Sequence, residues 1–329
     1  MHEFQTDGQN SSVVIGRSME YALPVNWDLV VVPRGTAGSS VGPDGQGVQW
    51  VGEYGYAGIG LGETTAFGIT IPAQNGLQDA VNEAGVYVGE LYLPGFTAYA
   101  STEGVAAEKL LAPMDAGSYV LATSGSVTEA IEQLKKVLVW AQVIEPIGVV
   151  PLHLVIHDRS GASAVIEWID GEMTVNDSPL GVATNAPPFP WHITNLSNFV
   201  NLSVLDVEPI KLEGQKLAAI GAGSGWLGLP GDYTPPSRFV RAVALSGTAY
   251  DDADSAGAAR TALHILGSFD IPKGTIRDRA PEGVTAAQAA GLGDFTSFVS
   301  VSELGETPAY GYRTYDDMTP RRFELAEGR

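Results

Sequence analysis

The stretch that most constrains this chain lies near its beginning. Residues 12–20 read Ser-Val-Val-Ile-Gly-Arg-Ser-Met-Glu, an apolar run that ends on a basic and an acidic residue three positions apart. A short apolar run bounded by Gly and polar residues predicts a buried strand. Taken alone, the pattern favours an N-terminal edge strand with a solvated ion pair between Arg17 and Glu20. Later segments point back to this end of the chain and change that interpretation.

The composition predicts one large folded domain. The chain has 329 residues, of which 44% are hydrophobic, so it can bury a sizeable core. Its formal net charge of −20 disfavours nucleic acids and anionic membranes as partners, because long-range repulsion opposes both. Cysteine is absent, which excludes disulfides and thiolate metal sites. No run approaches the ~18 consecutive apolar residues that a membrane helix needs.

The beginning of the chain leaves the compartment open. Met1 is followed by His2 and Glu3, without the basic and apolar regions of a signal peptide. We therefore expect either an intracellular protein or a mature form to which a start codon was added. The location is periplasmic or secreted if a signal peptide was removed, and cytoplasmic otherwise.

Alternating strand and helix patterns predict an α+β fold in a single domain. Ser126 and Glu129 fit a capping box before the clearest helical segment, and residues 253–266 have helical spacing. Residues 82–85 predict a turn, and residues 35–48 a surface loop. Strands are expected at residues 12–17, 28–33, 86–93, 152–158, 162–169, 295–301 and 310–315.

Two motifs favour ordinary structural roles. Residues 223–228 match the pattern G-x-G-x-x-G, but no strand precedes them and a Pro follows where a helix should open, so we interpret them as a loop. His153 and His157 are four apart on a predicted strand and point to one face, whereas Asp158 points to the other. We therefore expect two half-buried histidines rather than a metal site. His192 stands alone in the sequence.

Asn185 and Arg238 each admit a structural and a functional interpretation. Asn185 precedes the corner Ala-Pro, where its ordinary role is an Asn turn and its functional role is a fixed N–H donor to an oxyanion. Arg238 follows a Pro pair at which a helix should begin, and the helix dipole disfavours an arginine in the first turn. That position suggests a buried partner, although a surface arginine is the commoner case.

Five segments, in chain order, resemble the choloylglycine hydrolase family, which includes penicillin V acylases and conjugated bile acid hydrolases. They are residues 16–20 (GRSME), 82–85 (NEAG), 184–187 (TNAP) with Trp191 and His192, 228–239 (GLPGDYTPPSRF) and 271–274 (IPKG). The resemblance covers nearly the whole chain, and its third and fourth segments are specific. It implies an N-terminal-nucleophile fold over residues 1–329, a four-layer αββα sandwich of two antiparallel sheets between helical layers. It implies no metal or organic cofactor.

The resemblance also implies residue roles. Members of the family hydrolyse amides with an N-terminal cysteine, whose thiolate attacks the carbonyl while its own α-amine serves as the base. Arg17 resembles the arginine that stabilises the thiolate, and Glu20, where most relatives have Asp, would orient the α-amine. Asn185 matches the oxyanion-hole asparagine, and Arg238 the buried arginine that closes the charge network. Tyr92 occupies the second oxyanion position, where the backbone N–H acts; bile-salt enzymes often have Asn there, and acylases often Tyr.

The chain departs from the family at the nucleophile. The position that should carry Cys is Met1, whose thioether has no acidic proton and cannot form an acyl-enzyme. The native enzyme could start with Cys, with this chain a recombinant form; the Cys could have been replaced to trap a ligand; or the chain is a natural homologue that only binds. We favour the first two jointly, because a buried cluster containing Arg17, Glu20 and Arg238 costs stability without a nucleophile to serve.

We therefore expect an amide hydrolase of penicillin V acylase type, whose partner is a small-molecule N-acyl amide. Candidate substrates are phenoxyacetyl penicillin, N-acyl homoserine lactones and conjugated bile salts. Tyr21, Trp27 and Tyr92 are candidates to line an apolar substrate pocket, and Tyr92 with Glu20 favours an acylase. The alternatives are a conjugated bile acid hydrolase or a non-catalytic binding homologue. The resemblance also implies a homotetramer, in which residues 195–222 grip a neighbour and residues 207–212 form the exposed arm.

Overall fold

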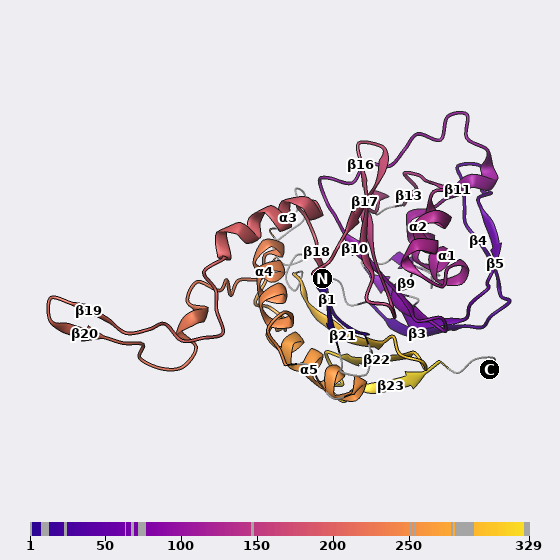
Figure 1. Ribbon diagram of the computed structural model, residues 1–329. Coiled ribbons are helices and arrows are strands. Elements are labelled where there is room, and N and C mark those ends of the chain that lie inside the picture. The colour runs from indigo at the N-terminus through magenta and orange to yellow at the C-terminus, as the bar shows by residue number, and fades with distance from the viewer. Residues whose placement is uncertain are drawn as a thin grey trace.

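The chain folds into four layers. The computed structural model describes residues 2–7, 13–22, 25–62, 64–66, 69–71, 77–145, 148–250, 252, 254–277, 279 and 293–325. Two antiparallel sheets face each other at the centre (Figure 1). Helices α1 (Ala116–Thr123) and α2 (Val127–Leu134) cover one sheet, and α4 (Pro235–Ser246) and α5 (Ser255–Gly267) cover the other. This arrangement confirms the predicted αββα sandwich.

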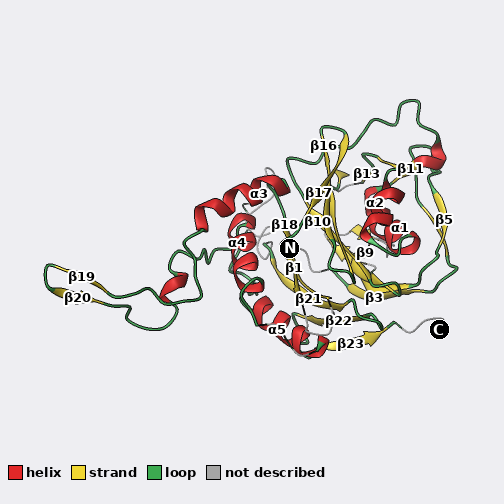
Figure 2. Cartoon of the chain, viewed as in Figure 1, coloured by secondary structure: helices red, strands yellow, loops and turns green. Residues whose placement is uncertain are grey.

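The strands divide into a six-stranded and a seven-stranded sheet (Figure 2). The first runs β18 (Val182–Thr184), β1 (His2–Asp7), β2 (Val13–Tyr21), β21 (Phe295–Glu303), β22 (Ala309–Thr314) and β23 (Arg321–Glu324). The second runs β17 (Glu172–Asp177), β16 (Ser163–Ile169), β15 (Leu152–Asp158), β10 (Val86–Tyr92), β9 (Leu77–Asn82), β6 (Tyr56–Leu61) and β3 (Trp27–Val32).

Shorter elements complete the described chain. The two-stranded pairs are β4 (Ala37–Ser39) with β5 (Gln49–Val51), β7 (Thr64–Ala66) with β8 (Ile69–Ile71), β11 (Leu110–Leu111) with β12 (Leu138–Val139), β13 (Val143–Ile144) with β14 (Gly148–Val149), and β19 (Ile210–Leu212) with β20 (Gln215–Leu217). The remaining helices are α3 (Phe189–Asn195) and the 3-10 turns η1 (Ala107–Lys109), η2 (Pro113–Asp115), η3 (Leu196–Phe199) and η4 (Ser224–Trp226). Because β4 lies within residues 35–48, the prediction that this whole stretch is a loop was wrong.

Two apolar cores separate the layers. One lies between the sheets and under α4 and α5, and includes Ile15, Tyr87 and Phe239. The other joins the outer face of the seven-stranded sheet to α1 and α2, and includes Leu121 and Ile166. Both faces of β15 and β16 are buried, which explains why apolar residues stand next to each other in these strands, as Leu-Val-Ile in β15 and Ala-Val-Ile in β16.

The sequence signals for helix starts and turns hold. The Ser126 hydroxyl accepts from the backbone N–H of Glu129 (3.2 Å), so Ser126 caps α2 as predicted, while the Glu129 carboxylate accepts from the N–H of Gly125, one residue before the cap (2.7 Å). Between β9 and β10, the amide of Asn82 accepts from the N–H of Val86 (2.9 Å) and donates to the carbonyl of Leu121 in α1 (2.9 Å). The Asn82 turn therefore also fastens the helical layer to the sheet.

The edge-strand interpretation of β2 was wrong. β2 lies inside its sheet, with β1 on one side and β21 on the other. Arg17 is fully buried and Glu20 is 7% exposed, so neither belongs to a solvated surface pair. The cause is β1, a polar segment without an apolar run, which pairs with β2 along its whole length and covers that edge.

The histidines of β15 are also more buried than expected. His153 and His157 are 1% and 0% exposed, because the face of β15 that carries them packs against the six-stranded sheet rather than facing solvent. Burial lowers the pKa of each imidazole to about 3. Both rings are therefore neutral at neutral pH.

Candidate active site

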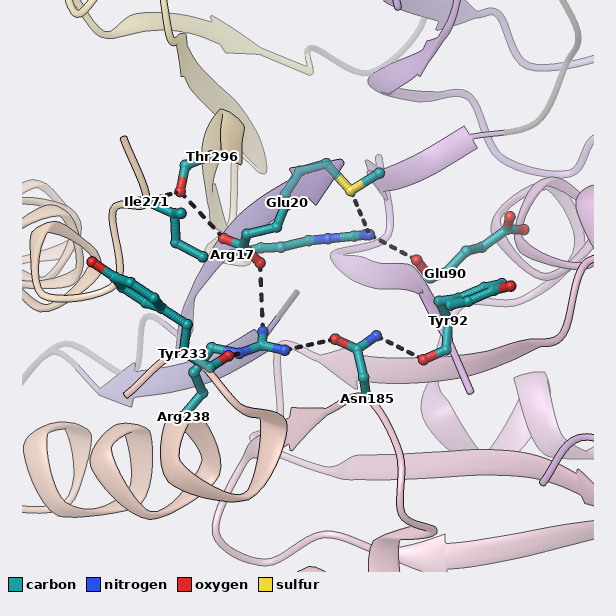
Figure 3. Close-up of polar contacts among 10 residues, drawn as sticks. Arg17, Glu20, Glu90, Tyr92, Asn185, Tyr233, Arg238, Ile271 and Thr296 are labelled. Carbon is teal, nitrogen blue, oxygen red and sulfur yellow. Dashed lines mark hydrogen bonds and ion pairs between the residues drawn. The ribbon is translucent and has the colours of Figure 1, made fainter. Parts of the chain in front are cut away.

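A pocket of about 660 Å³ opens where β2, β10 and the end of β18 meet the start of α4. Glu20 reaches it from β2, Tyr92 from the last position of β10, Asn185 from the residue after β18, and Arg238 from the first turn of α4. Arg17 lies beside them on β2 (Figure 3). The structure thus brings together five of the six predicted catalytic positions. The sixth, Met1, lies outside the described residues.

The beginning of β1 is directed at this pocket. His2 pairs with Ser18 on β2 and with Thr184 on β18. The residues that follow these two partners, Met19 and Asn185, both line the pocket. The backbone register therefore directs the amino-terminal end of β1 toward the space between Asn185 and β2.

The Arg17 side chain lies where the hydrogen-bonded ladder between β9 and β10 ends. The ladder between these strands ends at the pair Gly89 and Asp79. Beyond that pair the Arg17 guanidinium donates to the carbonyls of Gln78 and Glu90, the latter at 2.7 Å. Its Nη2 also lies 3.9 Å from the sulfur of Met19. A buried cation is thereby fixed between the two sheets, beside the pocket wall.

Glu20 and Arg238 form a buried ion pair. The Glu20 Oε2 atom lies 3.4 Å from Arg238 Nη1, and the Thr296 hydroxyl donates to Oε1 at 3.4 Å. The pairing of β2 with β21 shifts register between Met19 and Glu20, and such a bulge re-aims the side chain that follows it. Burial lowers the pKa of the Arg238 guanidinium and the Glu20 carboxylate raises it. Arginine stays charged at any physiological pH, so the pair is ionic.

Arg238 fixes the orientation of the Asn185 amide. Its Nη2 donates to Asn185 Oδ1 at 2.9 Å, and Asn185 Nδ2 donates to the carbonyl of Tyr92 at 2.7 Å. A guanidinium has no acceptor, so the oxygen of the amide must face Arg238 and its nitrogen must face Tyr92. The amide N–H groups are therefore presented at the pocket wall next to β10.

The backbone of Tyr92 faces the same place. The N–H of Leu93 donates to the carbonyl of Pro151 beside β15, at 2.8 Å. Backbone groups of successive residues in an antiparallel strand point to opposite sides, so those of Tyr92 point away from β15 and toward Asn185. Its bond from Asn185 agrees with this direction. Two N–H donors, one from an amide side chain and one from the backbone, thus converge on one wall.

His192 supports the corner that carries Asn185. Its Nε2 lies 2.9 Å from the carbonyl of Asn185, and its ring stacks on Phe239 of α4 at 4.9 Å. Burial lowers the pKa of His192. The residue pattern alone left this histidine isolated, and only its place in the third segment of the family resemblance, just after the Pro corner, drew attention to it.

The rest of the pocket wall is mostly apolar and aromatic. Tyr21 and Trp27 pack edge to face with their ring centroids 6.1 Å apart, and both line the pocket together with Tyr92. Burial, with Tyr92 and Asp294 nearby, raises the pKa of the Tyr21 phenol, which is therefore neutral. Further lining residues are Leu61, Met114, Ile144, Val149, Leu152, Ile271 and Ile276. All three predicted substrate-binding residues thus border one cavity.

Several contacts of the site gave no sequence signal. Gln78 and Glu90 act through backbone carbonyls, which every residue carries. Thr296 and Asp294 lie on or before β21, far along the chain from the motifs. Among the described residues, no helix is long and apolar enough to cross a membrane, and no three His, Asp or Glu gather as a metal site requires.

A family model matches nearly the whole chain, and known proteins match large parts of it. The family model of linear amide C–N hydrolases, choloylglycine hydrolase family, matches residues 3–327. The bile salt hydrolase/transferase of Clostridium perfringens is 34% identical over 241 residues, 73% of this chain and 69% of that protein. The penicillin V acylase of Pectobacterium atrosepticum is 29% identical over 188 residues, 55% of this chain and 47% of that protein.

Solved structures agree with the sequence matches. A variant of conjugated bile acid hydrolase from Clostridium perfringens superposes with a TM-score of 0.81 at 26% identity, covering 100% of this chain and 94% of that one. Penicillin V acylase from Agrobacterium tumefaciens has a TM-score of 0.71 at 23% identity, covering 99% and 86%, and shows the same fold. The chain therefore belongs to the choloylglycine hydrolase family of linear amide C–N hydrolases.

Proposed function

We propose that this fold hydrolyses N-acyl amides of the kind that penicillin V acylases cleave, such as phenoxyacetyl penicillin and N-acyl homoserine lactones. The observation that carries the proposal is the chain of contacts from Glu20 through Arg238 and Asn185 to Tyr92, beside the beginning of β1. This chain of contacts supports the proposal, because N–H donors held in a fixed orientation can stabilise the negative charge that develops on an amide carbonyl during attack.

The reaction needs a nucleophile at position 1. A cysteine there would pass its thiol proton to its own α-amine and attack the carbonyl carbon, giving an oxyanion stabilised by the Asn185 amide and the Tyr92 N–H. The C–N bond then breaks, and the leaving nitrogen takes the proton held by the amine. Water attacks the thioester, which releases the acid and restores the thiol. Arg17 would stabilise the thiolate, and Glu20 would orient the amine.

The pocket suits an aryl or alkyl acyl group. Its volume of about 660 Å³ is ordinary for a small-molecule site, and its wall is dominated by apolar residues with a few polar groups at one side. Tyr92 and Glu20 support an acylase over a conjugated bile acid hydrolase. Sequence identity supports the alternative function, a conjugated bile acid hydrolase. The bile salt hydrolase/transferase is identical to this chain at 34% of the aligned residues, and the penicillin V acylase at 29%. A non-catalytic binding homologue would keep the pocket without turnover.

Replacing the residue at position 1 tests the proposal. The variant Met1→Cys, prepared so that residue 1 carries a free amine, should release acid from phenoxyacetyl penicillin or an N-acyl lactone, whereas the matched variant Met1→Ala should not. In the cysteine background, Asn185→Ala should lower kcat by about 10²–10³, as for other oxyanion donors. A folded, correctly processed cysteine variant that turns over no N-acyl substrate would contradict the proposal and favour a binding protein.

We further propose that the chain assembles as a homotetramer through residues 195–222, and from this point we call this whole segment, which includes residues 207–212, the arm. The hairpin β19–β20 extends away from the body (Figure 1). Large apolar side chains along the arm are exposed, among them Leu205 at 74% and Ile210 at 59%. An exposed apolar patch of this kind marks an interaction surface.

A further inference from the structure

A buried carboxylate lies on a strand that Arg17 contacts. Asp79 belongs to β9 and is 0% exposed. It follows Gln78, which lines the pocket and whose carbonyl accepts from the Arg17 guanidinium. Burying a charged group is costly unless that group is paired or hydrogen-bonded, and the reaction proposed above gives Asp79 no part. Its position therefore has to be explained by what it contacts.

Among the described residues, three hydroxyl groups donate to the Asp79 carboxylate. Tyr310 of β22 donates to Oδ1 at 2.8 Å, and Ser300 of β21 donates to Oδ2. Tyr87 of β10 also donates to Oδ2, at 3.3 Å. An ionised carboxylate only accepts, so this set of donors suits it. Because β21 and β22 belong to the six-stranded sheet and β9 to the seven-stranded sheet, Asp79 ties the two sheets together.

Both ladders of β9 change at Asp79. The ladder with β10 ends at the pair formed by Asp79 and Gly89. In the ladder with β6 the register shifts at the next step, which leaves Gln78 as the extra residue of a bulge. A bulge residue is left out of the regular ladder, and the strand bends there. The carbonyl that meets Arg17 therefore belongs to a residue outside the ladder, and Asp79 is the neighbour that anchors it.

Arg17 approaches this cluster from the other sheet. It stands opposite Ser300 in the ladder between β2 and β21. Burial and then the Asp79 carboxylate raise the pKa of the Tyr310 phenol, while the Arg17 cation opposes them. The phenol therefore keeps the proton that it donates to Asp79. Around one point between the sheets, the cation thus contacts residue 78 while the hydroxyl groups hold residue 79.

We propose that Asp79 is a positioning residue of this site. Anchored to the six-stranded sheet, it holds β9 where the Gln78 carbonyl meets Arg17, and so fixes the guanidinium that would stabilise a thiolate at position 1. The inference rests on the proposed function and adds to it a residue that acts through Arg17 rather than on the substrate. Loosening this anchor should weaken stabilisation of the thiolate while the apolar pocket wall, and with it substrate affinity, stays in place.

The thiol of the Met1→Cys variant reports this effect without requiring turnover. The chain has no other cysteine, so the pH dependence of alkylation by iodoacetamide, with Met1→Ala as the blank, gives the pKa of that thiol. In this background Tyr310→Phe removes one hydroxyl from Asp79 and changes no charge. We expect the alkylation midpoint to rise by about half to one pH unit, and kcat on phenoxyacetyl penicillin to fall about three- to tenfold at nearly unchanged KM.

Two further variants complete the experiment. Ser300→Ala is a smaller change that removes another hydroxyl from Asp79, and it should move the midpoint in the same direction. The matched control Tyr312→Phe removes a phenol hydroxyl from the same strand as Tyr310, but one that bonds Arg321 rather than Asp79. It should leave both the midpoint and kcat unchanged. Urea unfolding of each variant separates a loss of stability from a change in the folded site.

Each outcome decides the inference. A midpoint that stays or falls in folded Tyr310→Phe and Ser300→Ala overturns the positioning role, even if both variants unfold more easily; if Tyr310→Phe does not fold, Ser300→Ala alone decides. An equal rise in Tyr312→Phe also overturns it, as does a parent midpoint at the ordinary cysteine value near 8.5, because Arg17 would then not stabilise the thiolate. If both variants raise a lowered parent midpoint but no N-acyl substrate is turned over, the proposed function fails and the positioning of Arg17 by Asp79 stands.

Discussion

The body and the arm of this protein each depart from the usual placement of side chains: the body buries charged groups, and the arm exposes large apolar groups. In the body, Arg17 and Arg238 are 0% and 5% exposed, so cations lie inside. On the arm, Val200 and Ile220 are 85% and 107% exposed, so large apolar groups lie outside. The buried cations contact oxygens of the same chain, whereas nothing in the described chain covers these arm residues. The buried cations of the body are therefore compensated within one chain, whereas the exposed apolar residues of the arm are what the proposed tetramer would cover.

Because of this difference, substitutions in the two regions should change different free energies. Removing one member of a buried ion pair leaves the other charge uncompensated in a poorly solvated place, which destabilises strongly. Removing an exposed apolar group from a single subunit changes few contacts, so the folded and unfolded states are affected alike. Substitutions in the body should therefore change folding, and substitutions in the arm should change association.

The largest effect should come from Arg238→Met. The variant leaves the buried Glu20 carboxylate without its ion-pair partner and removes the donor that orients Asn185. We expect the free energy of unfolding at pH 7 to fall by about 3–5 kcal/mol in urea titrations. The double variant Glu20→Gln with Arg238→Met removes both charges and should lose less than the single variant. A loss below about 1 kcal/mol in Arg238→Met would show that the pair does not support the fold.

A smaller, pH-dependent effect should come from His157 in the body. Among the described residues, neither ring nitrogen of His157 has a hydrogen-bond partner, and burial lowers its pKa to about 3. In the unfolded chain the histidine pKa is near 6.5. Between about pH 3 and 6.5 the unfolded chain therefore has His157 protonated, whereas the folded chain keeps it neutral. Stability is therefore full above pH 6.5 and is lost as the pH falls toward 3.

His157→Leu should remove this dependence. Urea unfolding of variant and parent should be measured at pH 8 and at pH 4.5. The free energy of unfolding of the variant minus that of the parent should be about 2–3 kcal/mol larger at pH 4.5 than at pH 8. His153, His192 and the buried carboxylates titrate in both proteins and cancel in the difference. His157→Gln changes packing differently but also lacks the proton site, so it should show the same pH difference. A parent and variants that lose stability in parallel would show that His157 is not buried as a neutral ring.

The sequence was a good guide to the residues of the site because side-chain chemistry determines their partners. Glu20, Asn185 and Arg238 were predicted as candidate site residues on residue type and motif, and the structure brings them together through charge and amide complementarity. The capping box of Ser126 predicted the start of α2 in the same way. Their catalytic roles stay predictions.

Elements fixed by their surroundings could not be predicted. β1 is a polar segment whose backbone is held by β2 and β18, so its own residues give no strand pattern. α1 is buried on every side from Ala116 to Ala122, and a helix without an exposed face shows no amphipathic period. The contribution of Asp294 to the pocket likewise depends on where β21 is placed, which no local pattern records.

The smallest effect on folding should come from the arm, and it separates the two regions most directly. The triple variant Ile210→Thr, Leu212→Thr, Leu217→Thr replaces exposed apolar residues of β19 and β20 with residues that favour strands equally well. Sedimentation at micromolar concentration should show a tetramer for the parent and smaller species for the variant. The free energy of unfolding of dilute protein, measured in urea, should differ between variant and parent by less than about 0.5 kcal/mol.

The control for this prediction is the triple variant Val31→Thr, Val51→Thr, Val175→Thr. It also replaces exposed apolar residues with Thr, but on strands of the body, and it should remain tetrameric. The prediction is contradicted if the parent is a monomer, or if both triple variants dissociate equally. Either result would show that the exposed apolar residues of the arm do not hold subunits together and are exposed for another reason.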